Sequence, residues 1–183
     1  VPPETEPVRT VHIRATLLER LHRTDEAFAA YSEANRLMAE GPTEPIERAE
    51  QLRADLTAEL ALLTSEWRDS WQHAELDDGR ADPVFLIGFP RSGTTLLDTI
   101  LMGHPNTVVM EEQPPLNIVE QELGGAAALP GLNAEAIANA RARYFEEVEK
   151  LQPVGPGQLL IDKSPLFLYR LPLILRLFPN ARI

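Results

Sequence analysis

The passage from residue 84 to residue 103 limits the fold most, because an apolar run, a loop and a helical pattern follow one another without interruption. VFLIG at 84–88 is short, continuous and suited to a strand buried on both faces, which is typical of a parallel sheet. The loop 88–95 contains glycine and proline, and TTLLDTILMG at 94–103 then has helical spacing. Strand, loop and helix in this order predict an α/β domain. Four apolar side chains of the helix are expected to face the sheet: Leu96, Leu97, Ile100 and Leu101.

The loop itself, GFPRSGTT at 88–95, fits the frame G-x-x-x-x-G of loops that cradle phosphate groups. In such a loop the backbone N–H groups and the amino end of the following helix bind phosphate or sulfate oxygens. Arg91 can add a charge-assisted contact, and Ser92, Thr94 and Thr95 can donate hydroxyl hydrogen bonds. The loop therefore predicts a local anion site, for which a purely structural strand-to-helix turn is the alternative.

Further elements of the same domain follow the loop. Residues 133–150 have the pattern of a helix with Asn133 as its cap, and QLLID at 158–162 is the next candidate for a buried strand. Residues 166–178 are apolar and largely helical, and Pro172 either kinks this helix or marks its true start. The last residues, 179–183, have the composition of a turn before a third strand, so we expect the domain to continue beyond them.

The first 76 residues are expected to be helical and to form a separate segment. Apolar residues at helical spacing predict a hairpin over about 11–39 and a long helix over about 45–71. The leucine-rich face of the long helix is expected to be packing surface or part of a helical bridge between the two segments. The hairpin resembles a tetratricopeptide repeat, and any amphipathic helix pair is the alternative. Because such repeats are stable only in arrays, we expect further repeats before Val1. The polar loop 77–83 is the predicted boundary, with an α/β domain over 83–183.

The composition excludes several classes of protein. The chain has no cysteine, and its four histidines are scattered, so a transition-metal site is not expected. The net charge of −11 disfavours nucleic acid as a partner, because phosphate contacts need clustered lysine and arginine. No stretch is apolar enough to span a membrane and no secretory signal is visible, so we expect a soluble, cytoplasmic protein.

Several short motifs together resemble the sulfotransferases that use 3′-phosphoadenosine 5′-phosphosulfate. PRSGTTL at 90–96 is similar to the family's 5′-phosphosulfate loop, and the histidine and proline at 104–105 followed by MEE at 110–112 are similar to a second family stretch. DKSP at 162–165 and LFPNAR at 177–182 resemble two more. The similarity is strongest to tyrosylprotein sulfotransferases and to bacterial sulfotransferases that carry tetratricopeptide repeats. It implies an α/β fold with a P-loop-like parallel sheet flanked by helices.

The resemblance also implies a role for individual residues. Glu112, which rather than Glu111 falls on the family position when counted from His104, would be the general base. Lys163 would stabilise the leaving phosphate. The donor would be 3′-phosphoadenosine 5′-phosphosulfate, used without a metal, and the acceptor a hydroxyl of a peptide tyrosine, a carbohydrate or a small molecule. The donor-binding residues would be Arg91, Ser92, Gly93, Thr94 and Thr95.

Two other functions stay open at this stage. A P-loop kinase or nucleotidase would need a lysine at the position of Thr94 and an acid that holds Mg²⁺, whereas the acid at the strand end, Asp162, stands directly beside Lys163. A non-enzymatic scaffold would bind a partner protein through the helical repeats and carry a degenerate α/β part. Magnesium-dependent nucleotide binding would support the first, and partner binding that survives Arg91→Ala and Lys163→Ala would support the second.

Overall fold

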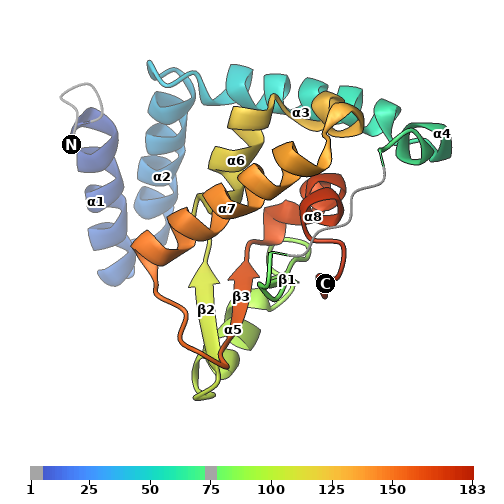
Figure 1. Cartoon of the computed structure of the whole chain (residues 1–183). Coiled ribbons are helices and arrows are strands. Elements are labelled where there is room, and N and C mark those ends of the chain that lie inside the picture. Colours follow the sequence, from blue (N-terminus) through green and yellow to red (C-terminus); the bar gives the residue numbers. More distant parts are fainter. Residues whose placement is uncertain (1–5, 73–77) are drawn as a thin grey trace. The chain divides into compact units, whose positions relative to one another are not determined.

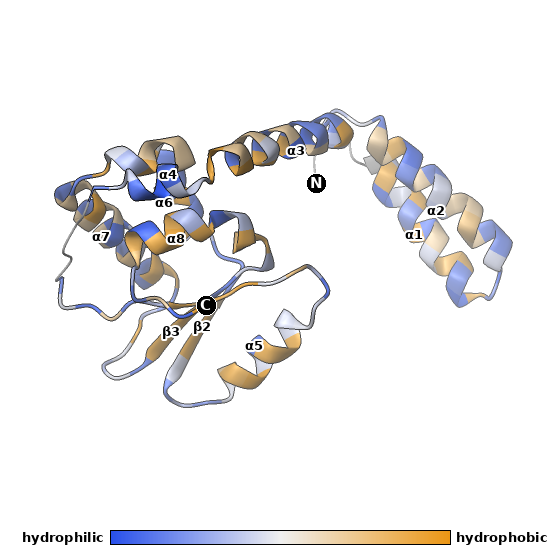
Figure 2. Ribbon diagram, turned by 90° about the vertical axis from the view of Figure 1, so that its right-hand side faces the viewer, coloured by the Kyte–Doolittle hydropathy of each residue, from blue (hydrophilic) through white to orange (hydrophobic). Residues whose placement is uncertain are grey.

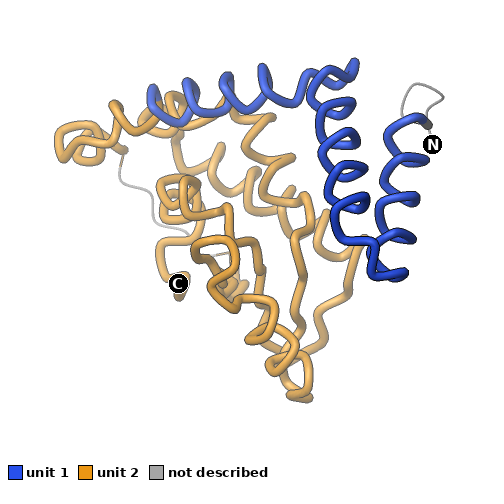
Figure 3. Tube along the Cα trace, turned by 180° about the vertical axis from the view of Figure 1, so that it is seen from behind, with its two compact units in different colours: residues 1–58 blue, residues 59–183 orange. Residues whose placement is uncertain are grey.

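The computed structural model describes residues 6–72 and 78–183 and divides the chain into two compact units. Unit 1 covers residues 1–58 and unit 2 covers residues 59–183 (Figure 3). The division falls inside a helix. The boundary expected over residues 77–83 stays a prediction, and its first residue lies outside the described residues.

Unit 1 contains a helical hairpin made of α1 (Glu6–Arg20) and α2 (Thr24–Ala39). The chain reverses at His22, whose φ of 55° is left-handed, and Arg23 N donates to Leu18 O over 3.0 Å. Small side chains let the two helices approach closely, and the buried contacts come from Ala15, Leu18, Ala27 and Ala30. The hairpin was expected from the helical spacing, and its assignment as a tetratricopeptide repeat stays a prediction.

The helix expected over 45–71 is two helices, α3 (Pro45–Leu62) and α4 (Ser65–Asp69). Thr64 separates them because its side chain caps α4 by accepting a hydrogen bond from Trp67 N over 3.1 Å. No residue of α3 is buried within the described chain. The role expected for its leucine-rich face, packing surface or helical bridge, stays a prediction.

The α/β fold expected from the sequence is present in unit 2. Its sheet has three parallel strands, β1 (Val84–Leu86), β2 (Thr107–Glu111) and β3 (Leu159–Lys163), in the order β1-β3-β2. The first and last were expected from their apolar runs. β2 was not, although TVVME has the β-branched residues of a buried strand. A fourth chain segment begins to pair with β1 through a parallel bridge between Val84 and Arg182.

Helices cover both faces of this sheet. The helix α5 (Thr94–Met102) lies on one face, and α6 (Pro115–Leu123), α7 (Ala134–Leu151) and α8 (Leu171–Leu177) lie on the other (Figures 1 and 2). The cap expected for α7 is present, since Asn133 accepts a hydrogen bond from Ala136 N over 2.8 Å. A 3₁₀ helix precedes α8, and Pro172 lies in the first turn of α8, so this proline marks the true start of the helix.

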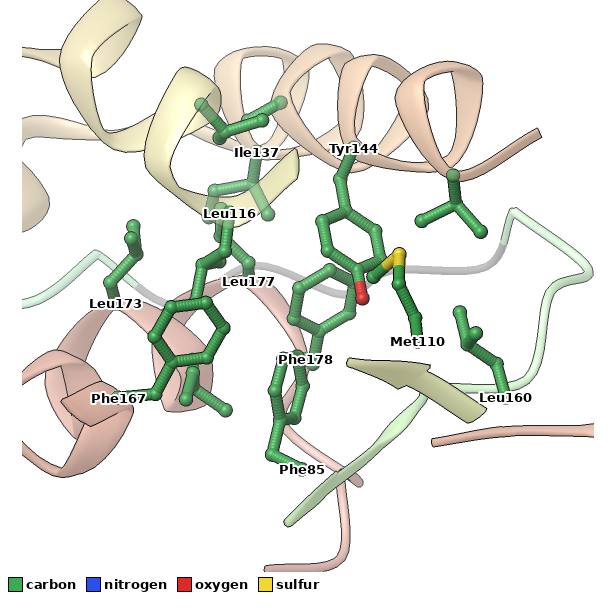
Figure 4. Packing of buried hydrophobic residues seen from close by; sticks show 14 of the residues in the cluster. Phe85, Met110, Leu116, Ile137, Tyr144, Leu160, Phe167, Leu173, Leu177 and Phe178 are labelled. Carbon is green, nitrogen blue, oxygen red and sulfur yellow. The ribbon is translucent and has the colours of Figure 1, made fainter. Parts of the chain in front are cut away.

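The hydrophobic core of unit 2 fills the space between the sheet and α6, α7 and α8 (Figure 4). Phe85 of β1, Tyr144 of α7 and Phe178 pack as an aromatic group, with ring centroids 5.0–6.4 Å apart. Trp67 and Trp71 pack against the same core from the start of the unit. One face of the sheet therefore packs against this core, and the opposite face is covered by α5.

A buried arginine fixes the approach to β1. Arg141 of α7 is 3% exposed and contacts Asp78 Oδ2 over 2.8 Å and Asp82 Oδ1 over 2.5 Å. It also donates to Leu177 O over 2.8 Å. The residues before β1 are thus bound to α7, which fixes the position of β1 and of the loop that follows it. Within the described residues, no helix is both long and apolar enough to cross a membrane.

Candidate functional site

The loop between β1 and α5 lies at the carboxyl end of β1 and is held at both of its ends. Ser164 N donates to Leu86 O over 3.2 Å, so the segment that follows β3 supports the point where the loop leaves the sheet. Gly93 ends the loop with a φ of 92°, a left-handed conformation that glycine adopts without strain. Arg91 is also left-handed, with a φ of 68°, which is unusual for a residue with a side chain.

The loop has the features of an anion cradle. The first N–H groups of α5 have no acceptor within the helix, and the amino end of the helix carries partial positive charge. An added Cβ on Gly88 would lie 3.1 Å from Ser92 Oγ and 3.3 Å from Thr94 Cγ2, so the loop folds tightly over a residue without a side chain. Arg91 and Ser92 are exposed and lie beside these donors. The arrangement suits the oxygens of a phosphate or sulfate group.

Lys163, the last residue of β3, places its ammonium group at this loop. Its side chain is fully buried, and Nζ lies 3.3 Å from Thr95 Oγ1. Side chains alternate along a strand, and the Asp162 side chain contacts Tyr144 in the core, so Lys163 points to the face that carries α5. Two adjacent residues of β3 therefore contact opposite sides of the sheet, Asp162 the hydrophobic core and Lys163 the loop.

Three carboxylates surround the Lys163 ammonium. The distances from Nζ are 2.8 Å to Glu111 Oε1, 3.0 Å to Asp98 Oδ2 and 3.1 Å to Glu112 Oε1. Burial alone would lower the pKa of Lys163, but the hydrogen bonds with these carboxylates outweigh it and raise the pKa above the ordinary value. Lys163 is therefore charged throughout the physiological pH range.

Glu112 follows β2 in a strained conformation. Its φ is 50°, and its backbone N–H donates to Lys163 O over 2.7 Å, which continues the pairing between β2 and β3 by one residue. The side chain is 58% exposed and its carboxylate contacts Lys163. Within the described residues, four non-glycine residues have positive φ, and Arg91 and Glu112 are two of them. Backbone strain of this kind collects at functional sites.

The structure brings together only part of the set of residues that the sequence predicted. Lys163, Glu112 and Thr95 meet directly. Ser92, Gly93 and Thr94 lie on the adjoining loop, and for the side chain of Arg91 no ion pair is found within the described residues.

Asp98 was not predicted at Lys163, Glu111 was named only as the neighbour of the expected base, and one expectation about α5 was wrong. Asp98 is the single buried residue of α5, while Leu96, Leu97 and Ile100, which were expected to face the sheet, are 69%, 44% and 65% exposed. The helix turns this way because Thr95 and Asp98, three residues apart, lie on one side and both contact Lys163. Hydrophobic spacing cannot reveal a helix that contacts a sheet through an ion pair.

Asp162 and His104 have other surroundings. Asp162 is fully buried on the core face, where Tyr144 Oη donates to its Oδ2 over 2.8 Å, and burial raises its pKa to about 7. His104 accepts a hydrogen bond from Asn106 N through Nδ1 and orders the turn before β2. In residues 6–72 and 78–183, no group of three or more His, Asp or Glu side chains is arranged to hold a metal ion.

Comparison with known proteins gives the family of the chain. The model of the sulfotransferase family matches residues 83–183, more than half of the chain, and the chain belongs to that family. Among individual relatives, protein-tyrosine sulfotransferase 1 of Mus musculus is 31% identical over 108 residues, which are 54% of this chain and 29% of the mouse protein. The human protein of the same name is 30% identical over the same length and shares.

A third relative is an uncharacterized protein of Aquifex aeolicus, 33% identical over 113 residues, or 55% of this chain and 15% of that protein. The chain thus matches less than a third of the length of these relatives. No solved structure matches the chain.

Proposed function

We propose that this chain binds 3′-phosphoadenosine 5′-phosphosulfate in the loop 88–95 and transfers its sulfuryl group to an acceptor hydroxyl. The observation that carries the proposal is the contact of Lys163 with both Thr95 and Glu112. One buried ammonium thereby joins the anion loop to an exposed carboxylate. Membership of the sulfotransferase family supports the same reaction class.

The loop and Lys163 would hold the donor's phosphosulfate. Backbone N–H groups at the start of α5, the hydroxyls of Ser92, Thr94 and Thr95, and the Arg91 guanidinium are hydrogen-bond donors suited to its oxygens. Lys163 carries a fixed positive charge in a water-poor position, so it can stabilise negative charge on the phosphate as the sulfur leaves. The tight turn at Gly88 supports this fit because any larger residue would press on Ser92 and Thr94.

Glu112 would act as the general base. It is exposed enough to meet an acceptor, and its contact with Lys163 keeps it within a few ångströms of the loop. The acceptor hydroxyl would give its proton to Glu112 while its oxygen forms a bond to sulfur. The bond between sulfur and the bridging phosphate oxygen breaks, and its electron pair stays on the phosphate. The products are a sulfate ester and 3′-phosphoadenosine 5′-phosphate, and Glu112 is left protonated.

The acceptor is proposed from similarity alone. Two relatives are named protein-tyrosine sulfotransferases, so a tyrosine hydroxyl in a peptide is the first acceptor to test, followed by carbohydrate and small-molecule hydroxyls. A protein partner bound through α1 and α2 stays a prediction.

A thermal-shift titration with 3′-phosphoadenosine 5′-phosphate, compared with ATP and Mg²⁺, tests the donor. A ligand that binds only the folded state at 100 times its Kd stabilises it by about 2.7 kcal/mol. We expect the bisphosphate to raise the melting temperature without metal and Arg91→Ala to abolish the shift. The matched control is Arg53→Ala, at an exposed arginine of α3, which should leave the shift unchanged.

The other outcomes are decisive as well. Stabilisation by ATP with Mg²⁺ alone would replace the proposal with a P-loop kinase or nucleotidase. No stabilisation by either ligand, on a chain that melts cooperatively, would favour a scaffold that binds proteins and carries out no transfer.

A further inference from the structure

The three carboxylate partners of Lys163 differ sharply in exposure. Asp98 is 1% exposed at its side chain, whereas Glu111 and Glu112 are 44% and 58% exposed. A carboxylate in contact with water can leave an ion pair and be hydrated, but a buried one that loses its cation pays a large desolvation cost. Asp98 is therefore the carboxylate that cannot leave Lys163.

The hydrogen-bonding capacity of lysine points the same way. An ammonium group has three N–H donors, and Nζ of Lys163 has four oxygen partners within 3.3 Å. An anionic ligand in the loop would repel the two exposed glutamates and need a donor of its own. Nζ donates hydrogen bonds to Thr95, Glu111 and Glu112, whereas Asp98 Oδ2 is an ion-pair partner that accepts none. With the bond to Thr95 retained and both glutamates displaced, two N–H groups are released, one that can turn to Asp98 and one for the ligand.

The position of Asp98 links the lysine to the loop mechanically. Asp98 lies one turn after Thr95 on α5, the helix that begins where the loop ends. Its other oxygen, Oδ1, lies 3.3 Å from Thr99 Oγ1, whose proton is donated mainly to Thr95 O over 2.7 Å. The buried ion pair between Asp98 and Lys163 thus joins α5 to the end of β3, in addition to the hydrogen bond between Lys163 and Thr95.

We propose that Asp98 is a positioning residue that keeps Lys163 charged and directed at the loop when Glu111 and Glu112 have moved away. It divides the three carboxylates into one permanent partner and two exchangeable ones. The exchange would free Glu112 to act as base at the moment when the donor is bound. This division of roles rests on the proposed function, whereas the ion pair and its effect on Lys163 do not.

The chain has only two lysines, Lys150 and Lys163, so NMR of ¹³C-labelled lysine can follow both without ambiguity. The starting variant is Glu111→Gln/Glu112→Gln, which imitates departure of the exposed carboxylates, and Asp98→Asn is then added to it. With Asp98 present, Lys163 should stay charged above about pH 10.4, the ordinary lysine value. Without it, burial should dominate and lower the midpoint by about 1–3 pH units. Lys150 should titrate identically in both variants.

Equal titration of Lys163 in the two variants would overturn the proposal. If Asp98→Asn does not fold, the double variant Asp98→Asn/Lys163→Met decides. Recovery of folding would mean that the charge at position 98 serves Lys163, and continued unfolding would mean that Asp98 has another structural task.

Sulfotransfer assays separate this inference from the proposed function. In an active chain, Asp98→Asn should lower kcat at least about tenfold with a smaller change in the KM of the donor, and Asp98→Glu should recover part of the loss. An equal loss in Asp98→Glu, or a change confined to KM, would contradict a positioning role. An inactive wild-type chain would refute the proposed function, while the NMR titration would still decide the role of Asp98.

Discussion

Replacing Asp162 by asparagine should remove a pH dependence from the stability of unit 2. In the folded chain, burial raises the pKa of Asp162 to about 7, while an unfolded aspartate has a pKa of about 3.9. The folded state therefore binds this proton more tightly than the unfolded state does. As pH rises from about 4 to about 7, the free energy of unfolding should fall, because the folded state must either retain the proton or bury a charge.

The magnitude follows from the two pKa values. A difference of about three pH units corresponds to about 4 kcal/mol, of which about 3 kcal/mol is lost between pH 5 and pH 8. Asparagine is neutral at both pH values and can still accept the hydrogen bond of Tyr144. Its NH₂ group would occupy the position of Oδ1, which has no partner, at a cost of about 1–3 kcal/mol that is independent of pH.

Urea denaturation at pH 5 and pH 8 measures this difference. Trp67 and Trp71, the two tryptophans of the chain, pack against the core of unit 2, so their fluorescence reports the unfolding of that unit. The change in the free energy of unfolding between pH 5 and pH 8 is first taken for each protein, and the change in the variant is then subtracted from that in wild type. Contributions of other titrating groups are the same in both proteins and cancel in this subtraction. Wild type should lose about 3 kcal/mol more than Asp162→Asn. Equal losses in the two proteins would refute a raised pKa at Asp162.

Three further predictions concern the loop, the base and a buried ion pair. Gly93→Ala should lower the free energy of unfolding by about 1–2 kcal/mol, because Gly93 has a left-handed φ, and should also weaken bisphosphate binding. Gly157→Ala is the control: its φ of 78° is also left-handed but lies outside the loop, so it should lower stability and leave binding unchanged. Glu112→Gln should lower kcat by about 10²–10⁴-fold in a sulfotransfer assay, and a loss below tenfold would contradict its role as base. Calorimetry should find bisphosphate affinity equal to wild type or higher, because the variant removes a negative charge beside the anion loop. Arg141→Met should cost about 3–5 kcal/mol by urea denaturation because Asp82 is left buried without its cation; a change under 1 kcal/mol would mean that solvent replaces the arginine.

The sequence was sufficient for the parts of the fold that have a local signal. The run 84–88, the loop after it and the cap at Asn133 each depend on neighbouring residues, and the structure has β1, the loop and α7 at these places. Lys163 could be singled out because it follows a buried strand at the edge where parallel sheets bind ligands. Family motifs added Glu112, which no local pattern distinguishes from Glu111.

Contacts between distant residues could not be predicted in this way. Asp98 is 65 positions before Lys163, and nothing in the helical pattern of α5 indicates that its polar side faces the sheet. β2 was not predicted because only Met110 and Glu111 of its five residues were interpreted, as part of a motif, and residues 107–109 were given no structure. The end of α3 was also not predicted. Thr64 caps α4 with its side chain and so separates the two helices, but the leucine spacing continues across this position and indicates one long helix.

The adjacent pair Asp162 and Lys163 makes the alignment of β3 with its neighbours critical. A slip of one residue would exchange their faces, placing the ammonium against Tyr144 and the carboxylate at the anion loop. Polarity does not oppose such a slip strongly, because both residues are charged. The strand is central, however, and hydrogen-bonds to β1 on one side and β2 on the other, so a shift must break both ladders together. The loop 152–158 leads into β3, so deletions in it should be tolerated as long as β3 keeps its alignment with β1 and β2. A deletion that forces β3 out of this alignment should abolish the anion site and unfold the protein together.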